Sequence, residues 1–331
     1  MKKFISTAIA AIMLAGCFAG CSTAGINAAS KKTKIVTTIF PEYDWVMNVL
    51  GDKASEADVT MLLDNGVDLH SFQPNASDIM KISTCDVFIY IGGESDAWVD
   101  DALKESVNKD MIVVNLLDTL GDAVKEEEVV EGMQEEDEED HDHDHANGDP
   151  EEIEYDEHVW LSLHNSATLV EKISEALQKA DPSNAETYKT TAAGYMEKIN
   201  ALDKQYHDTV DNASCKTILF GDRFPFRYLV DDYGLSYYAA FVGCSAETEA
   251  SFETITFLAG KVDELGLKVV MTIEGSDNRI AETIIQNTES KDQKILSVDS
   301  MQSVTSKDVA AGASYLDIMT KNLDVLKEAL G

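Results

Sequence analysis

Hydrophobic and polar positions along the chain alternate between short β-branched runs and longer stretches with helical spacing. The first half holds the runs KIVTTI, ADVTML, DVFIYI and MIVVN, and the second half holds KTILF, YYAAF, KVVMTI and KILSV. Helical stretches begin near Tyr43, Asn75 and Ser95, and others cover 224–233, 248–265, 276–288 and 310–330. Asn75 and Ser95 are candidate N-caps. This alternation predicts an α/β fold of two similar lobes, each a mostly four-stranded parallel sheet flanked by helices.

A long helical stretch separates the two halves. Its larger apolar positions recur every three or four residues: Tyr188, Ala192, Tyr195, Ile199, Leu202 and Tyr206. Pro182 precedes it, as expected at a helix start, and the stretch is long enough to span roughly 40 Å. We therefore expect an N-terminal lobe over 31–181, a linking spine helix over 182–211 and a C-terminal lobe over 212–331.

The first thirty residues differ from the rest. Two lysines, the apolar run FISTAIAAIM and the box LAGC follow one another, which is typical of a secretory signal that ends at a lipidated cysteine, Cys17. Cys21, in FAGC, is the second candidate, and a plain cleaved signal is the other interpretation. We expect residues 1–30 to be the signal peptide and tether, and the protein to be extracytoplasmic and lipid-anchored to the cell membrane.

Charge and cysteine content narrow the class of protein. The net charge of −35 excludes nucleic acid as a partner and suits cation binding. Residues 126–157 contain 18 Asp or Glu and no Lys or Arg, so we expect an acidic His-rich loop there. Beyond the tether remain Cys85, Cys215 and Cys244, without a C-x-x-C motif, which argues against a cysteine-based zinc site. We expect buried thiols, with a Cys215–Cys244 disulfide as the alternative.

Histidines supply the candidate metal chemistry. His70, in GVDLHSFQP, and His158, in DEHVWLSLHNS, follow strands or loops at lobe edges, where open α/β sheets bind ligands. A ligating imidazole normally donates its second N–H to a carboxylate or carbonyl, for which the nearby candidates are Asp68, Asp156 and Glu157. Trp160 is expected to serve packing, and two histidines on helical patterns are expected to be solvated or capping residues: His164 and His207.

These motifs resemble those of the zinc/manganese solute-binding lipoproteins of ABC transporters, the cluster A-I or cluster 9 family. GVDLHSFQP, DEHVWLSLHNS, FGDRFPFRYLVDDYGL and VVMTIEGSDNRIAETI occur in the order of the family's four motifs, between Lys34 and Leu330. The resemblance implies that the metal ligands are His70, His158, Asp222 and Glu274, with Asp277 as the alternative fourth ligand. Asp222 departs from the histidine that many zinc-binding members have, and an Asx-turn or helix cap is its alternative role.

Two imidazoles and two carboxylates suit Zn²⁺, while carboxylate-rich sites also suit Mn²⁺. The loop histidines His141, His143 and His145 alternate with aspartates, so we expect them to collect zinc as an accessory site. A purely solubilising acidic loop is the alternative.

The resemblance implies a monomeric, non-enzymatic receptor that captures Zn²⁺ in an interlobe cleft and delivers it to an ABC-type membrane permease. A manganese-specific member of the same family is the first alternative. A secreted zinc hydrolase would need motifs such as H-E-x-x-H, which the sequence lacks. A surface adhesin is the remaining alternative, and it should expose an apolar or aromatic patch. The segment from Arg223 to Phe241 is rich in aromatic residues, but its strand and helix pattern indicates core packing.

Overall fold

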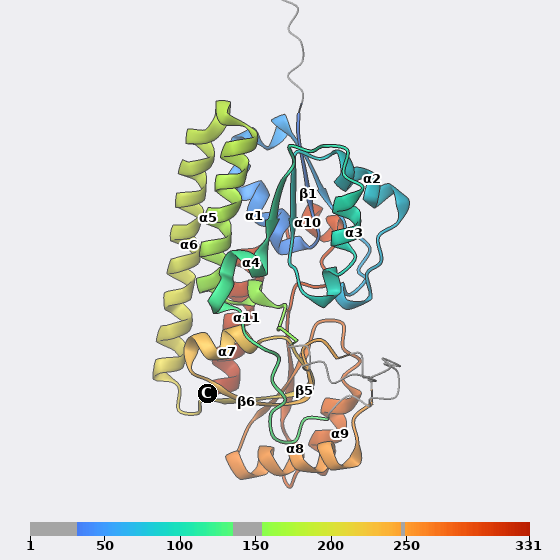
Figure 1. The fold of residues 1–331 in the computed structure, drawn as a ribbon. Helices are drawn as coiled ribbons and strands as arrows, with labels where there is room; N and C mark the ends of the chain where they lie inside the picture. The colour runs from blue at the N-terminus through green and yellow to red at the C-terminus, as the bar shows by residue number, and fades with distance from the viewer. Residues whose placement is uncertain (1–31, 135–153, 246–248) are drawn as a thin grey trace, which may run out of the picture. The chain divides into compact units, whose positions relative to one another are not determined.

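Two parallel sheets organise the chain (Figure 1), in a computed structural model that describes residues 32–134, 154–245 and 249–331. The first sheet has the order β2-β1-β3-β4, with β1 (Thr33–Thr37), β2 (Ala57–Met61), β3 (Val87–Tyr90) and β4 (Ile112–Asn115). The second repeats that order as β6-β5-β7-β8, with β5 (Thr217–Phe224), β6 (Ser236–Val242), β7 (Val269–Ile273) and β8 (Lys294–Val298). The predicted fold of two similar four-stranded parallel lobes is confirmed.

Helices connect and cover the strands, as parallel pairing requires. The first lobe carries α1 (Phe40–Leu50), α2 (Ala76–Thr84), α3 (Val99–Lys104), α4 (Leu116–Leu120) and α5 (Leu163–Ala180). After α6 (Ala185–Asn212), the second lobe carries α7 (Arg227–Tyr233), α8 (Phe252–Leu265), α9 (Arg279–Asn287), α10 (Ser306–Ala310) and α11 (Tyr315–Leu330). Short 3₁₀ turns include η2 (Leu69–Ser71), η3 (Glu94–Asp96) and η6 (Val159–Leu161).

The two predicted N-caps have different outcomes. Asn75 caps α2, since its side chain accepts hydrogen bonds from the backbone of Ser77 and Asp78. The expectation of a helix that begins at Ser95 is wrong: Ser95 lies within η3, and α3 begins at Val99. The reason is that Ser95 interacts with residues far along the chain instead of with the next helical turn.

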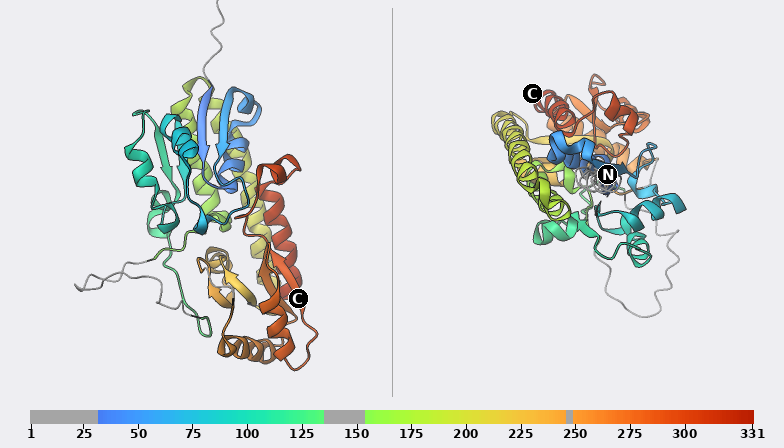
Figure 2. Two further views of the ribbon diagram at one scale, coloured as in Figure 1. Left: turned by 90° about the vertical axis from the view of Figure 1, so that its right-hand side faces the viewer. Right: turned by 90° about the horizontal axis from the view of Figure 1, so that it is seen from above.

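The long helix α6 links the two lobes as predicted. In its N-terminal half, the Tyr195 hydroxyl donates to Asp44 of α1 over 3.0 Å. In its C-terminal half, the Tyr206 hydroxyl donates to the backbone oxygen of Met319 in α11 over 2.6 Å. Helices α5 and α6 run side by side (Figure 1), and α11 runs beside α6 in the side view of Figure 2. Helix α6 therefore contacts helices of both lobes: α1 in the first and α11 in the second.

Trp160 also joins the lobes, in the packing role expected for it. Its side chain is fully buried, and its indole N–H donates to the backbone oxygen of Ser300 over 2.8 Å. The Tyr315 hydroxyl in turn donates to the backbone oxygen of Trp160 over 2.8 Å. Residues Thr33–Gly331 thus form one compact unit.

The described parts of the acidic segment pack against the second lobe. Glu126 forms an antiparallel bridge with Tyr155, and the backbone N–H of Gln134 donates to the backbone oxygen of Ala240 over 3.0 Å. The accessory histidines and the lipidation candidates lie outside the described residues: Cys17, Cys21, His141, His143 and His145. Among the described helices, none has the length and apolar character needed to cross a bilayer.

Candidate metal centre

The loops at the carboxyl ends of both sheets bring three ligand atoms together. Over residues 32–134, 154–245 and 249–331, His70, His158 and Cys244 place one ligand atom each within 4.8 Å of the others. His70 lies in η2 after β2, His158 is the N-cap of η6, and Cys244 follows β6. Carboxyl ends of parallel strands are where open α/β sheets bind ligands.

The two histidines face each other through their Nε2 atoms, which lie 3.4 Å apart. Their ring centroids are 5.3 Å apart and the planes are inclined by 57°. The His158 side chain is fully buried and that of His70 is 15% exposed. Two imidazoles bound to tetrahedral zinc at about 2.05 Å would place their nitrogens roughly 3.3 Å apart. The observed separation matches one edge of such a tetrahedron.

Asp156 fixes the orientation and tautomer of His158. Its Oδ1 accepts from the backbone N–H of His158 over 2.8 Å and lies 2.9 Å from the ring Nδ1. A carboxylate oxygen accepts, so Nδ1 carries a proton, and Nε2 is the ring nitrogen that faces His70. The Tyr228 hydroxyl donates to the Asp156 backbone oxygen over 2.7 Å and holds this turn in place.

His70 is held by a second set of contacts. Its Nδ1 lies 2.8 Å from the Ser95 hydroxyl, and its backbone N–H donates to Asp68 Oδ1 over 3.1 Å. Glu157 Oε1 accepts from the Ser95 backbone N–H over 2.8 Å, while Glu157 Oε2 lies 3.8 Å from His70 Nδ1. Gly93 has φ +83°, and a Cβ there would clash with Glu157 Oε1. The tight glycine turn therefore lets Glu157 reach Ser95.

Burial and neighbouring charge act differently on the two imidazoles. Burial, with the repulsion of His158, lowers the pKa of His70 well below its ordinary value. Burial also lowers the pKa of His158, but the nearby carboxylates of Asp156, Glu157 and Glu127 raise it more, so that the His158 pKa lies above its ordinary value. Binding a cation at Nε2 of both rings requires both to be neutral there.

The predicted carboxylate ligands lie in the second lobe, outside this group of three. Asp222 Oδ1 accepts from the Arg223 backbone N–H over 2.9 Å, and its Oδ2 accepts from that of Ile273 over 3.4 Å. It lies where the register between β5 and β6 shifts. Glu274 follows β7, and its carboxylate accepts from the backbone N–H and hydroxyl of Ser300, both over 2.7 Å. That these two side chains are ligands stays a prediction.

Burial, with a contribution from Asp299, raises the pKa of Glu274 to about 7. Asp277, the alternative fourth ligand, is exposed, accepts from the Arg279 backbone N–H over 3.0 Å and pairs with its guanidinium. These contacts with Arg279 lie at the start of α9, whose N-cap is Asn278. His164 and His207 are exposed on α5 and α6, as expected for solvated residues.

Cys244 and Ser95 also lie at this centre, and no motif in the sequence indicated that they would. Cys244 is half-buried, and its backbone N–H donates to Glu127 Oε1 over 3.1 Å. Cys85, Cys215 and Cys244 are all free thiols, so the alternative of a Cys215–Cys244 disulfide is wrong. The signal that could have identified Cys244 is the rule that placed His70: both follow a strand at the carboxyl edge of a sheet.

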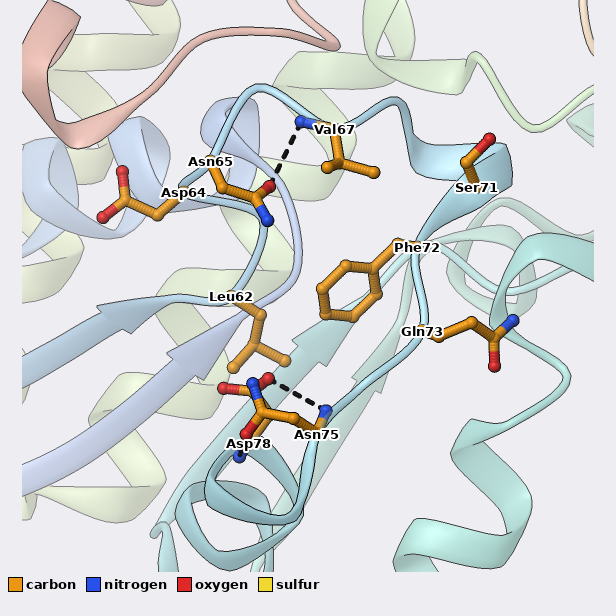
Figure 3. Close-up of a pocket in the computed structure, with 9 residues that line it drawn as sticks. All are labelled: Leu62, Asp64, Asn65, Val67, Ser71, Phe72, Gln73, Asn75 and Asp78. Atoms are coloured by element: carbon orange, nitrogen blue, oxygen red, sulfur yellow. Dashed lines mark hydrogen bonds between the residues drawn. The ribbon is translucent and has the colours of Figure 1, made fainter.

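A cavity of about 380 Å³ lies beside the His70 turn (Figure 3). Its lining residues come from one segment: Leu62, Asp64, Asn65, Val67, Ser71, Phe72, Gln73, Asn75 and Asp78. In Figure 3 the Leu62 and Phe72 side chains lie between the loop and α2. His70 is absent from this lining, so the cavity flanks the turn and not the metal centre.

Comparison with known proteins identifies the family of this chain. The family described as "Zinc-uptake complex component A periplasmic" matches residues 35–329. The chain is 32% identical over 311 residues to the zinc-binding protein AdcA of Streptococcus pyogenes serotype M6, which covers 90% of this chain and 56% of AdcA. The chain therefore spans little more than half the length of that relative.

Two solved structures share the fold. The Zn(II)-bound ZnuA-like domain of Streptococcus pneumoniae AdcA is 28% identical with a TM-score of 0.68, over 91% of this chain and 99% of that domain. The metal-dependent lipoprotein YcdH of Bacillus subtilis is 27% identical with a TM-score of 0.71, over 90% of this chain and 99% of that protein. Both solved structures share the two-lobe fold of this chain. The chain belongs to the ZnuA family, whose description is zinc-uptake complex component A, and the resemblance inferred from the four motifs is confirmed.

Proposed function

We propose that this protein is an extracytoplasmic receptor that captures Zn²⁺ between His70 and His158 and delivers it to an ABC-type permease for uptake. The observation that carries the proposal is the 3.4 Å separation of the two Nε2 atoms. Family membership supports zinc uptake as the process, and AdcA of Streptococcus pyogenes is named as zinc-binding. The protein acts as a binding protein that transports its ligand, and not as an enzyme.

The centre is built to hold an ion and not merely to pair two rings. Two imidazole lone pairs directed at each other repel, and a shared cation removes that repulsion. Asp156 holds one ring and Ser95 holds the other, which is the outer-shell support that metal-binding histidines normally have. Imidazole ligands suit zinc better than manganese.

We further propose that Cys17 carries the lipid that holds the receptor at the membrane, next to its permease. The LAGC box supports this assignment, and the similar protein YcdH of Bacillus subtilis is named a metal-dependent lipoprotein. Within the acidic segment, His141, His143 and His145 alternate with aspartates and collect zinc as an accessory to the His70–His158 site.

Zinc accumulation by cells that carry this receptor tests the proposal. Under zinc limitation, a strain that lacks this protein should accumulate zinc again when it expresses the wild-type protein. It should also do so with His164→Ala, a substitution at an exposed histidine of α5. It should fail to recover with His158→Ala. Recovery with His158→Ala, at equal protein level, would contradict the proposed role of the pair.

A further inference from the structure

A thiol from the second lobe lies beside the two imidazoles of the first. The Cys244 Sγ is part of the group whose ligand atoms all lie within 4.8 Å of one another. His158, which lies beside this thiol, is fully buried. Its Nε2 faces the Nε2 of His70 at 3.4 Å. The paired imidazoles are therefore an observation, independent of the cysteine, that points to a bound cation.

We propose that Cys244 binds the captured metal as a thiolate, so that the centre takes two imidazole nitrogens from the first lobe and one sulfur from the second. This inference rests on the proposed function, because it names a further ligand of the same ion. It also names the class of cargo, since a thiolate with two imidazoles selects zinc over manganese.

The backbone around Cys244 is fixed from two sides. The Cys244 N–H donates to Glu127 Oε1 over 3.1 Å, and the Arg223 guanidinium donates to the Ser245 backbone oxygen over 3.4 Å. Gly243 brings this turn against His158: a Cβ on Gly243 would lie 3.1 Å from His158 Cε1. The absence of a side chain at Gly243 is what allows the thiol to approach the imidazoles.

The distances need little adjustment. With Zn–N near 2.05 Å and Zn–S near 2.3 Å, a tetrahedral site places sulfur roughly 3.5 Å from each nitrogen. A change in the Cys244 side-chain rotamer, or a small approach of the turn, brings atoms within 4.8 Å to that spacing. When Zn²⁺ binds, the thiol loses its proton to the solvent buffer and the sulfur lone pair forms the bond to the metal.

The sulfur also explains how the second lobe contributes a ligand. Asp222 accepts two backbone N–H groups of its own sheet, and Glu274 accepts the N–H and hydroxyl of Ser300. Both carboxylates thus stabilise the second lobe internally. A coordination bond from Cys244 would link the second lobe directly to the metal that His70 and His158 hold.

X-ray absorption at the zinc edge of the zinc-loaded, full-length protein tests this ligand. We expect a Zn–S distance near 2.3 Å in the wild type. The same scattering shell should persist in Cys215→Ser, whose thiol lies 3.7 Å from the Thr217 backbone oxygen in the second lobe, and vanish in Cys244→Ser. A wild-type spectrum with nitrogen and oxygen scatterers alone would overturn the proposal. This outcome does not depend on whether either variant folds.

Zinc titrations of the same three proteins separate this inference from the proposed function. We expect Cys244→Ser to lose at least about 100-fold in zinc affinity, because even outer-shell partners are worth about 10–100-fold. One fewer proton should be released per zinc bound. Unchanged affinity and proton release in Cys244→Ser would reject the thiolate while leaving the His70–His158 site intact. Absence of tight zinc binding by the wild type would reject both.

Discussion

The Arg223 guanidinium donates to Asp68 Oδ2 over 2.6 Å, which joins the second lobe to the turn that carries His70. Asp68 also accepts from the His70 backbone N–H over 3.1 Å. Arg223 therefore acts on the metal centre twice, through this turn and through the Ser245 backbone oxygen beside Cys244. The ion pair holds the lobes in the arrangement that brings the ligands together.

Arg223→Ala should release zinc faster. The ion pair is partly exposed, so its loss should weaken the closed arrangement by about 1 kcal/mol, which corresponds to a roughly fivefold faster dissociation. Stopped-flow mixing with a chelator measures the rate. Arg279→Ala removes the exposed Arg279–Asp277 pair and should leave the rate unchanged. Equal rates in all three proteins would show that the ion pair does not hold the ligands in place.

Asp156→Asn should weaken zinc binding by about 10–100-fold, because the ring of His158 loses the carboxylate that orients it and fixes its tautomer. Competition with a zinc-binding dye measures the affinity. Asp208→Asn, which alters an exposed pair with Lys204 on α6, is the matched control. An Asp156→Asn affinity within twofold of the control would contradict an orienting role for Asp156.

Two glycine substitutions should have opposite effects on stability. Gly243→Ala places a Cβ 3.0 Å from the Phe224 backbone oxygen and 3.1 Å from His158 Cε1. This overpacking should destabilise the fold by about 1–3 kcal/mol and weaken zinc binding. Gly194→Ala, in the interior of α6 with open space around it, should stabilise the fold by about 1 kcal/mol. Urea denaturation of both variants checks the signs.

The contact between Asp44 and α6 should make stability depend on pH. Burial raises the pKa of Asp44 from 3.8 to about 6, although hydrogen bonds from Tyr195 and Asn48 oppose the shift. The folded-state pKa exceeds the unfolded one, so this contribution to stability is complete below about pH 4 and is lost as pH rises through 6. From pH 4 to 7, the wild type should therefore lose about 2–3 kcal/mol relative to Asp44→Asn.

Urea denaturation at each pH gives that difference. Asp324→Asn, at an exposed pair with Lys327 on α11, should follow the wild type throughout. If the difference between wild type and Asp44→Asn stays constant with pH, the buried carboxylate is not the cause.

The fold was predictable because each strand and helix carries its own local pattern. The predicted spine over 182–211 corresponds to α6, Ala185–Asn212, since its apolar positions keep helical spacing over the whole length. The expected four runs in each half are the four strands of each sheet. Ser95 was misassigned, because its hydroxyl contacts His70 and its N–H contacts Glu157, both distant in sequence.

The histidine pair was predictable in kind, but the third ligand atom was not. His70 and His158 occur in recognisable motifs, whereas Cys244 stands alone and its proximity to them depends on how the second lobe sits on the first. The direction of the Asp222 side chain was not predictable either. Its carboxylate accepts from the Ile273 backbone N–H of the neighbouring strand, at a register shift that the sequence does not indicate. Local patterns specify elements, and side-chain directions at lobe edges depend on the tertiary structure.

The most direct test is a zinc titration of the protein in which His141, His143 and His145 are replaced by alanine, with and without His70→Ala. We expect one tightly bound zinc per chain that persists without the three loop histidines and disappears with His70→Ala. Tight binding that survives His70→Ala, or that vanishes with the loop histidines alone, would contradict a metal centre at His70 and His158.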